Sequence, residues 1–252
     1  MDTQRHAGRT ALVTGAGSGI GRATAIRLAQ EGARVVGCDI AEAGLSATEG
    51  ELADAGVKAD LHLVDITSQL DIDRLLRSIS EPVDLLANVA GIMDHFVPLS
   101  EVDDSSWERV MSVNLTGVMR LTRAVLPAMQ QAGSGAIVTV GSEASLRAGA
   151  AGAAYTTSKH AVIGLVKHVA YFYGPLGIRS NAVLPGAVAT GIGASAAPTS
   201  DWAIERAMAA LGTMGPVADP VQIASAISWL GCDEASNING AIMTADGGWS
   251  TA

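Results

Sequence analysis

A glycine-rich segment near the start of the chain limits the possible folds more than any other feature. It reads Thr-Gly-Ala-Gly-Ser-Gly-Ile-Gly over residues 14–21, between an apolar, β-branched run at 9–13 and a segment with helical spacing of apolar residues. This order of strand, glycine turn and helix predicts the first half of a βαβ unit. Glycine lets backbone amides approach a pyrophosphate, and the helix that follows directs its N-terminal dipole at the phosphates. The segment therefore predicts a dinucleotide site that includes Gly15, Ser18, Gly19, Ile20 and Gly21.

An acidic residue, Asp39, ends the second predicted strand at 34–39. An acidic residue about 20 residues beyond the glycine turn can accept hydrogen bonds from the ribose hydroxyls of adenosine. Its carboxylate also repels the 2′-phosphate of the phosphorylated cofactor. Ser18 in the turn carries no positive charge, and no Arg or Lys follows Asp39 closely. The sequence therefore predicts NAD rather than NADP as the cofactor.

Apolar, β-rich runs alternate with helical patterns along the whole chain, which predicts stacked βαβ units and a parallel sheet. The expected fold class is α/β, a single-domain Rossmann-like doubly wound parallel sheet of about seven strands with helices on both faces. Residues 1–252 would form one NAD-binding domain, with a mobile substrate lid near 191–215. The predicted strands lie near 9–14, 34–39, 58–64, 83–88, 135–141, 178–184 and 241–245. The predicted helices lie near 19–31, 41–56, 68–80, 103–131, 153–173, 200–213 and 219–231.

Three polar side chains form a candidate catalytic group. Tyr155 and Lys159 are four residues apart, so they share one face of the helix predicted at 153–173. An ammonium beside a phenol favours the phenolate, so we expect Lys159 to lower the Tyr155 pKa toward neutrality. Ser142 follows the predicted strand at 135–141 and is placed to supply a second hydrogen-bond donor. A proton donor, a helper hydroxyl and a nearby charge are suited to interconverting C–OH and C=O.

These residues give the chain a resemblance to the classical short-chain dehydrogenase/reductase family, from about Gly8 to Gly248. The glycine segment has the form T-G-x-x-x-G-x-G, and the chain closes with D-G-G at 246–248. Residues 88–91 resemble the N-N-A-G segment of the family, with Val89 in place of its second Asn. The resemblance implies the catalytic set Asn114, Ser142, Tyr155 and Lys159.

The resemblance also implies roles for individual residues. It gives Asp65 a contact with the adenine, and it makes Asn114 the residue that bends a long helix and holds a water leading to the lysine. Pro185 and Gly186 would lie beside the nicotinamide, and Thr190 would bind its carboxamide. The cofactor-binding residues expected beyond the glycine turn and Asp39 are Asp65, Ile66, Asn88, Ala90, Gly91, Tyr155, Lys159, Pro185, Gly186, Val188 and Thr190.

The predicted lid at 191–215 is small and apolar, which predicts an apolar substrate without a cationic anchor for phosphate or coenzyme A. Glu143 either pairs with Arg147 or contacts the substrate, and the sequence leaves both possibilities open. His95 is expected at the surface or in packing, with a role as a second acid as the alternative. The candidate substrate-binding residues are Met93, Glu143, Ser145, Gly149, Ala187, Met208 and Leu211.

Composition excludes several classes of function. The net charge is −9 without a basic cluster, so nucleic acid is not an expected partner. One of the two cysteines, Cys38, falls in a predicted buried strand, so a disulfide is not expected. The absence of a disulfide predicts a protein of the reducing cytoplasm. An N-terminal signal core and an apolar run of ~20 residues are both missing, which predicts a soluble protein without a membrane partner. The five histidines show no ligand spacing, so no metal is expected.

Two predicted helices, 103–131 and 153–173, are apolar around much of their circumference. Such helices need a second surface to bury them, and either the sheet with its neighbours or another subunit can supply it. We favour a subunit interface, because symmetric helix contacts are a common solution. The family resemblance implies a homotetramer or a dimer.

Together these features predict an NAD(H)-dependent oxidoreductase that interconverts a secondary alcohol and a ketone on a largely apolar small molecule. A 3-oxoacyl (carrier-protein or CoA) reductase-like ketoreductase is one alternative, although Asp39 and the acidic net charge disfavour it. An epimerase or dehydratase that uses NAD transiently is another. A non-catalytic NAD-binding protein is the alternative of a different class, and the intact catalytic set disfavours it.

Overall fold

The computed structural model describes residues 4–94, 96–192 and 200–251. In this part of the chain seven strands form one parallel sheet, in the order β3-β2-β1-β4-β5-β6-β7. The strands are β1 (Thr10–Thr14), β2 (Arg34–Asp39), β3 (Ala59–Leu63), β4 (Leu85–Asn88), β5 (Gly135–Val140), β6 (Ile178–Pro185) and β7 (Ile242–Ala245). The α-helices are α1 (Gly19–Gln30), α2 (Glu42–Asp54), α3 (Gln69–Ser78), α4 (Asp104–Met111), α5 (Val118–Ala132), α6 (Ala153–Tyr173), α7 (Asp201–Leu211) and α8 (Pro220–Gly231). The predicted α/β doubly wound sheet is confirmed.

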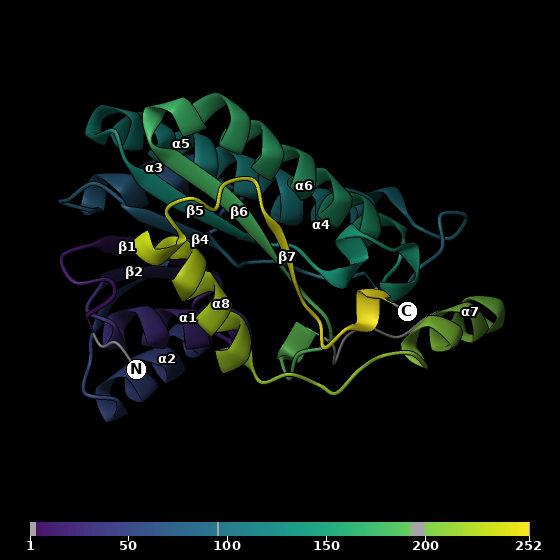
Figure 1. Cartoon of the computed structure of the whole chain (residues 1–252). Coiled ribbons are helices and arrows are strands. Elements are labelled where there is room, and N and C mark those ends of the chain that lie inside the picture. Colours follow the sequence, from purple (N-terminus) through teal and green to yellow (C-terminus); the bar gives the residue numbers. More distant parts are fainter. Residues whose placement is uncertain (1–3, 95, 193–199, 252) are drawn as a thin grey trace.

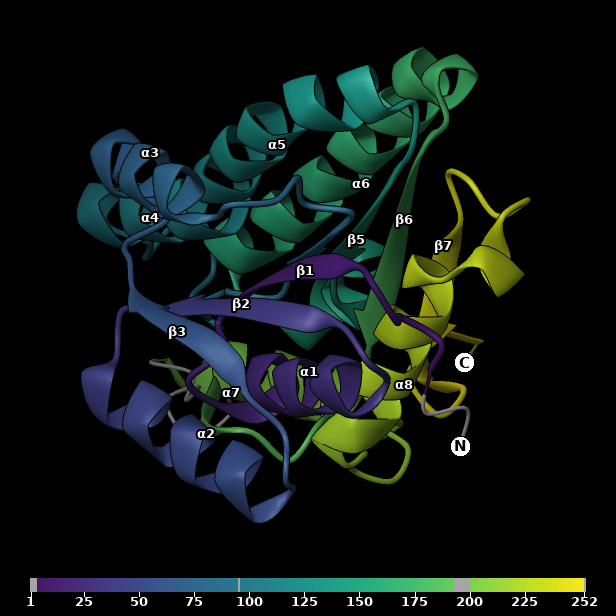
Figure 2. The ribbon, with the colours of Figure 1, turned by 90° about the vertical axis from the view of Figure 1, so that its left-hand side faces the viewer.

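Helices cover both faces of the sheet. Figure 2 shows α3, α4, α5 and α6 on one side of it and α1, α2 and α8 on the other. Each face has its own core: α1 and α8 bury Leu28 and Ile227 against the sheet, and α5 buries Leu121 and Met129 on the opposite face. Because the central strands are buried on both faces, their sequences are continuous apolar runs rather than alternating patterns.

The strand order reverses between β1 and β4, which pair with each other while β2 lies on the other side of β1. In doubly wound sheets ligands bind at the carboxyl ends of the strands beside such a switch point. The loops after β1, β2, β4 and β5 all begin at this edge. They carry the glycine turn, Asp39, the 88–91 segment and Ser142.

The predicted helix at 103–131 is present, but its middle turns are π-helical rather than α-helical. α4 ends at Met111, a π-helical turn covers Ser112–Gly117, and α5 continues to Ala132. The π turn places Asn114 so that its side-chain amide pairs with the backbone of Ile92 in the loop after β4. Turns of this type are rare and are frequent at functional sites. The interruption therefore depends on a tertiary contact, which helical periodicity does not show.

The helix predicted at 200–213 is present as α7, which extends beyond the end of the sheet near the C-terminus (Figure 1). Residues 193–199 of the predicted lid lie outside the described residues. α7 and the turn after it are fastened through Trp249, whose indole Nε1 donates to the carbonyl of Ala210 at 3.2 Å and to Thr213 Oγ1 at 3.1 Å.

Candidate active site

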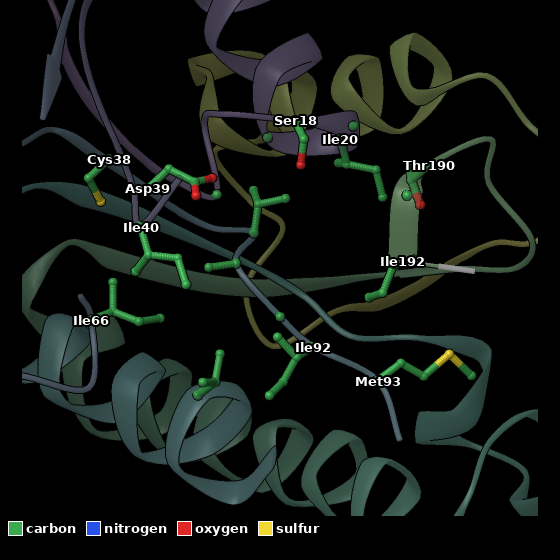
Figure 3. A pocket seen from close by; sticks show the side chains of 18 of the residues that line it. Ser18, Ile20, Cys38, Asp39, Ile40, Ile66, Ile92, Met93, Thr190 and Ile192 are labelled. Carbon is green, nitrogen blue, oxygen red and sulfur yellow. The ribbon is translucent and has the colours of Figure 1, made fainter. Parts of the chain in front are cut away.

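A cavity of about 450 Å³ opens at the carboxyl ends of β1, β2 and β4 (Figure 3). Asp39, Ile40 and Ile66 lie toward one end, and Met93, Thr190 and Ile192 lie toward the other. Most of the predicted cofactor-binding residues line it. The lining is Gly15, Ser18, Gly19, Ile20, Gly21, Cys38, Asp39, Ile40, Val64, Asp65, Ile66, Val89, Ala90, Gly91, Ile92, Met93, Arg109, Val113, Thr190, Gly191 and Ile192.

Asp39 is fixed at one end of the cavity by backbone amides. Its Oδ2 accepts a hydrogen bond from Gly17 N at 3.0 Å, and its Oδ1 accepts one from Ala41 N at 2.9 Å. A carboxylate has about four acceptor positions, so each oxygen retains capacity for a further donor such as a ribose hydroxyl. The next side chain, Ile40, is apolar and 70% exposed. A carboxylate beside an exposed apolar surface is suited to an adenosine without a 2′-phosphate.

The glycine turn packs too tightly for side chains. A Cβ on Gly21 would lie 2.0 Å from the carbonyl oxygen of Gly15, and Gly19 has φ of +48°. The N-cap of α1 is Ser18, whose side chain makes no capping hydrogen bond. The first amides of α1 therefore face the cavity beside Ser18, and a helix N-terminus of this kind suits a pyrophosphate.

The opposite end of the cavity holds an unsatisfied hydroxyl. Thr190 Oγ1 is buried and has no hydrogen-bond partner among the described residues. Its methyl group packs on the glycine turn, since a Cβ on Gly19 would lie 2.8 Å from Thr190 Cγ2. A buried hydroxyl without a partner is costly, so a ligand amide at this position would stabilise it. Both ends of the cavity thus fit a dinucleotide.

The candidate catalytic side chains meet beside β5 and α6. Tyr155 and Lys159 are both buried on α6, and the Lys159 ammonium lies 5.4 Å from the centre of the Tyr155 ring. Lys159 Nζ donates to the carbonyl oxygen of Val140 at 2.9 Å. Ser142 forms a hydrogen bond with the Tyr155 side chain, and its Oγ accepts one from Ala144 N at 3.1 Å. The structure therefore brings together the three residues that the sequence selected.

Burial dominates the electrostatics of this group. It raises the pKa of Tyr155 to about 12, against the lowering effect of the Ser142 hydrogen bond, and Asp94 raises it further. Burial likewise lowers the pKa of Lys159 to about 8. The sequence predicted the opposite direction for Tyr155, because spacing shows which charge is near but not how deeply the phenol is buried.

Asn114 is fully buried beside Lys159. Its Oδ1 accepts from Ile92 N at 2.9 Å, and its Nδ2 donates to Ile92 O at 2.9 Å and to Ser158 Oγ at 3.1 Å. Gly91 lies between them, since a Cβ there would be 3.4 Å from Asn114 Oδ1 and 3.5 Å from Lys159 Nζ. Asn114 thus joins the loop after β4 to the catalytic helix, and its role in holding a water stays a prediction.

Several predicted cofactor residues lie outside the cavity lining. Asn88 is buried and donates to Thr122 Oγ1 at 3.2 Å and to Thr139 Oγ1 at 3.4 Å. Pro185 pairs with Ala245 at the end of the sheet. Gly186 packs against the backbone of Asp246, and Val188 forms a bridge to Ala218.

On the substrate side, Glu143 is buried and forms an ion pair with Arg147. This is one of the two arrangements that the sequence left open, and Glu143 Oε2 has no hydrogen-bond partner among the described residues. Ser145 Oγ accepts from Ser142 N at 3.2 Å. His95 lies outside the described residues.

The other predicted substrate residues come from α7 and from the loops after β4, β5 and β6. Met93 and Leu211 pack with Tyr155 in one apolar cluster that includes Trp249. A Cβ on Gly149 would lie 2.7 Å from Ala210 Cβ. Met208 is 59% exposed, and the carbonyl of Ala187 accepts from Ala218 N.

Nine residues of the lining are not among the predicted site residues: Cys38, Ile40, Val64, Val89, Ile92, Arg109, Val113, Gly191 and Ile192. Ile40 and Ile92 directly follow Asp39 and Gly91, which end strand motifs. Their positions in the sequence could therefore have predicted that they line the cavity. Arg109 and Val113 come from α4 and the π turn. Nothing local in the sequence indicates which side of that helix faces the cavity.

Comparison with known proteins agrees with this geometry. Residues 9–201 match the family model described as short chain dehydrogenase. The chain belongs to the short-chain dehydrogenase/reductase family. As a member of this family, it is an oxidoreductase that acts on CH–OH groups.

Individual relatives of this short-chain dehydrogenase cover nearly the whole chain. The 3beta-hydroxysteroid dehydrogenase 2 of Eggerthella lenta is 40% identical over 259 residues, which cover 99% of each protein. The cis-4-hydroxycyclohexanecarboxylate dehydrogenase of Sinomonas cyclohexanicum is 39% identical over 250 residues, which cover 98% of each protein. A solved structure of a variant of actinorhodin polyketide ketoreductase with NADPH superposes with a TM-score of 0.87, at 35% identity and full coverage of both chains.

The described ranges of this short-chain dehydrogenase also bear on metal binding and on membrane insertion. Groups of three or more His, Cys, Asp or Glu side chains placed to hold a metal ion do not occur there. The helices in those ranges include none that is long and apolar enough to cross a bilayer.

Proposed function

We propose that this protein is an NAD-dependent dehydrogenase that interconverts a secondary alcohol and a ketone. The observation that carries the proposal is the buried group of Tyr155, Ser142 and Lys159 beside a cavity that Asp39 closes at its far end. The group can exchange a proton with an alcohol, and the cavity fits a dinucleotide.

The residues that would hold the cofactor follow from the cavity. The amides at the start of α1 would bind the pyrophosphate, Asp39 the adenosine ribose, and Thr190 Oγ1 the carboxamide. When bound, the nicotinamide supplies the hydride acceptor, and its positive charge favours the ionised form of a neighbouring phenol.

The side chains of the protein handle the proton and the charge on the substrate oxygen. In the oxidative direction Tyr155 takes the hydroxyl proton at its phenolic oxygen. Ser142 donates a hydrogen bond to the substrate oxygen as charge develops on it. The Lys159 ammonium favours the phenolate and would hold the nicotinamide ribose. Because burial raises the Tyr155 pKa to about 12, alcohol oxidation should become faster as the pH rises above neutrality.

Asp39 supports NAD as the cofactor. Its carboxylate lines the cavity where the adenosine ribose would bind, and Ile40 beside it is uncharged. Arg22 on α1 is engaged elsewhere, since it donates to Gly17 O and pairs with Glu51. Arg109 also lines the cavity, from α4. Solved neighbours with bound NADP or NADPH make the phosphorylated cofactor the competing choice, so the assay below compares the two.

A cyclic alcohol with an apolar body is the substrate class that we propose. Met93, Leu211 and Trp249 form an apolar cluster with Tyr155, and a flat ring system can pack against such a surface. Two relatives are named for alcohols on rings, a hydroxysteroid and a hydroxycyclohexanecarboxylate.

The test combines cofactor absorbance with one variant. Purified protein is mixed with NAD, and separately with NADP, and a panel of cyclic, aliphatic and aryl secondary alcohols. We expect reduced cofactor to form with NAD and cyclic alcohols, and Tyr155→Phe to remove nearly all turnover while NAD still binds. Tyr171→Phe, at an exposed site on the same helix, is the matched control and should keep full activity. Turnover retained in Tyr155→Phe would overturn the mechanism, and bound NAD without net reduction would favour the non-catalytic or internal-redox alternatives.

A further inference from the structure

The N-terminus of the catalytic helix α6 is capped by a residue from a distant part of the chain. α6 begins at Ala153, and its N-cap is Gly152, which has no side chain to accept hydrogen bonds from the first backbone amides of the helix. The carboxylate of Asp94, in the loop after β4, does so instead. Its Oδ1 accepts from Gly152 N at 2.9 Å, and its Oδ2 accepts from Tyr155 N at 3.1 Å. Asp94 is itself buried, so both bonds are shielded from water.

The same loop holds the helix at a second point. The carbonyl oxygen of Val97 accepts from Ala153 N at 3.0 Å. A Cβ on Gly152 would lie 2.5 Å from Val97 N and 2.6 Å from Asp94 Oδ2, so loop and helix are in direct contact. Phe96 has φ of +58°, a conformation that bulky residues rarely adopt and that persists only where surrounding contacts enforce it. The junction between this loop and α6 is therefore specific.

This junction connects the cofactor cavity to the catalytic phenol. Met93, the residue before Asp94, lines the cavity, whereas the amide that Asp94 Oδ2 binds belongs to Tyr155 itself. A shift of Asp94 would move the tyrosine relative to the cavity wall. Its negative charge also acts on the phenol and raises the Tyr155 pKa, in opposition to the hydrogen bond from Ser142.

Among the described residues, Asp94 is the one charge that shifts the Tyr155 pKa, although other charged groups lie on the elements packed around the phenol. The Lys159 ammonium lies 5.4 Å from the Tyr155 ring centre on α6 itself. The turn after β5 contributes the ion pair of Glu143 with Arg147, and α4 contributes Arg109 at the cavity. Glu143 is already neutralised by its partner, so the carboxylate at the helix N-terminus is the main negative charge that opposes the lysine.

We propose that Asp94 is a positioning residue, which fixes Tyr155 relative to the cofactor cavity and sets the balance of charge around its phenol. The inference rests on the proposed function, in which Tyr155 transfers the proton. It goes further because Asp94 acts through the backbone amide of Tyr155 rather than through its phenol.

The test removes the charge of Asp94 and follows the phenol directly. In the whole protein labelled at tyrosine Cζ, the chemical shift of Tyr155 is followed from neutral pH to the highest pH at which the wild type stays folded, and Tyr155→Phe assigns its signal. In Asp94→Asn, Tyr155 should ionise at lower pH than in the wild type, because a nearby negative charge is gone. Asp94→Glu keeps the charge and should restore the wild-type titration at least in part. If Asp94→Asn does not fold, Asp94→Ser replaces it, since a serine caps helices without a charge.

Steady-state kinetics supply the second readout. In Asp94→Asn we expect kcat for alcohol oxidation to fall on the order of 10-fold through misplacement of the phenol, with the Kd of NAD changed by less than about 2-fold. The acid limb of the kcat profile should move to lower pH. Asp219→Asn is the matched control, because Asp219 caps α8 by accepting from Val221 N at 2.9 Å, on the other face of the sheet. It should lower the melting temperature without moving either the titration or the kcat profile.

The titration and the melting temperature together distinguish a positioning residue from a structural cap. If Asp94→Asn only lowers the melting temperature, as Asp219→Asn does, while Tyr155 titrates as in the wild type, Asp94 is a structural cap and the inference is wrong. The titration needs neither cofactor nor substrate. A shifted titration in a protein that fails to oxidise any alcohol would therefore uphold the inference and overturn the proposed function instead.

Discussion

The buried histidine near the start of the chain predicts a loss of stability when the pH falls below neutrality. His6 is fully buried, and its Nε2 lies 3.2 Å from both the carbonyl oxygen and the Oγ of Ser228 on α8. Glu31, which is also buried, lies 3.7 Å from the same nitrogen. Burial lowers the pKa of His6 below its usual 6.5, and this effect exceeds the opposing attraction of Glu31.

The sign of the effect follows from proton binding. Because the His6 pKa is lower in the folded state, the unfolded chain binds more protons once the pH falls to about 6.5. The free energy of unfolding therefore decreases as the pH falls through that value, and the loss ends below the folded-state pKa. One proton changes this free energy by at most about 1.4 kcal/mol per pH unit. For a domain of this size that corresponds to a melting temperature lower by about 3–5 °C per pH unit.

The assay compares melting temperatures, followed by circular dichroism, from slightly alkaline to mildly acidic pH. The variant His6→Gln keeps a polar group near Ser228 but cannot be protonated, so its melting temperature should fall less steeply than that of the wild type. His160→Gln changes an exposed histidine on α6 and should leave the wild-type slope unchanged. Equal slopes in the wild type and in His6→Gln would refute the assignment of this pH dependence to His6.

Three further predictions concern the cavity, the lid and the surface of α6. Gly21→Ala should abolish NAD binding in calorimetric titrations, because its Cβ would lie 2.0 Å from the carbonyl oxygen of Gly15; unchanged affinity would contradict the tight packing of the turn. Trp249→Phe loses the hydrogen bonds to Ala210 O in α7 and to Thr213 Oγ1 just after it, so KM for the alcohol should rise by roughly 5-fold if α7 covers the substrate; an unchanged KM would show that substrate binding does not depend on these bonds. Tyr171→Asp should reduce the oligomer mass in sedimentation, since Tyr171 is 78% exposed on an apolar helix; an unchanged mass would place the interface elsewhere.

The strands and most helices could be predicted from the sequence because each is a local pattern. β1, β4 and β5 are continuous apolar runs, as burial on both faces of a parallel sheet requires. The helix at 103–131 was predicted as one element because its apolar periodicity continues through the π turn. That turn depends on the pairing of Asn114 with Ile92, 22 residues earlier in the chain.

The candidate site likewise has parts that local sequence patterns predict and parts that depend on distant contacts. The glycine turn, Asp39 and the spacing of Tyr155 and Lys159 are local motifs, and the structure places the first two in the cavity and the other two side by side. The direction of the Tyr155 pKa was wrong because it depends on burial, to which many segments contribute. Asp94 was not selected at all, since its bonds to α6 span 58 and 61 residues and match no motif.

The packing of α1 against α8 has a consequence for how the protein is made. α1 leaves the ribosome well before α8, yet it buries part of its apolar face against that helix, which ends at Gly231. His6 and Glu31 likewise find their partner Ser228 only when α8 has been synthesised.

Until then the nascent chain presents the uncovered side of β1 and α1 to the surrounding solution, where chaperones bind exposed apolar segments. α8 must therefore be synthesised before the glycine turn has its final support. A ribosome stalled before α8 would hold a chain that contains every residue of the phosphate-binding turn but lacks the helix that packs behind it.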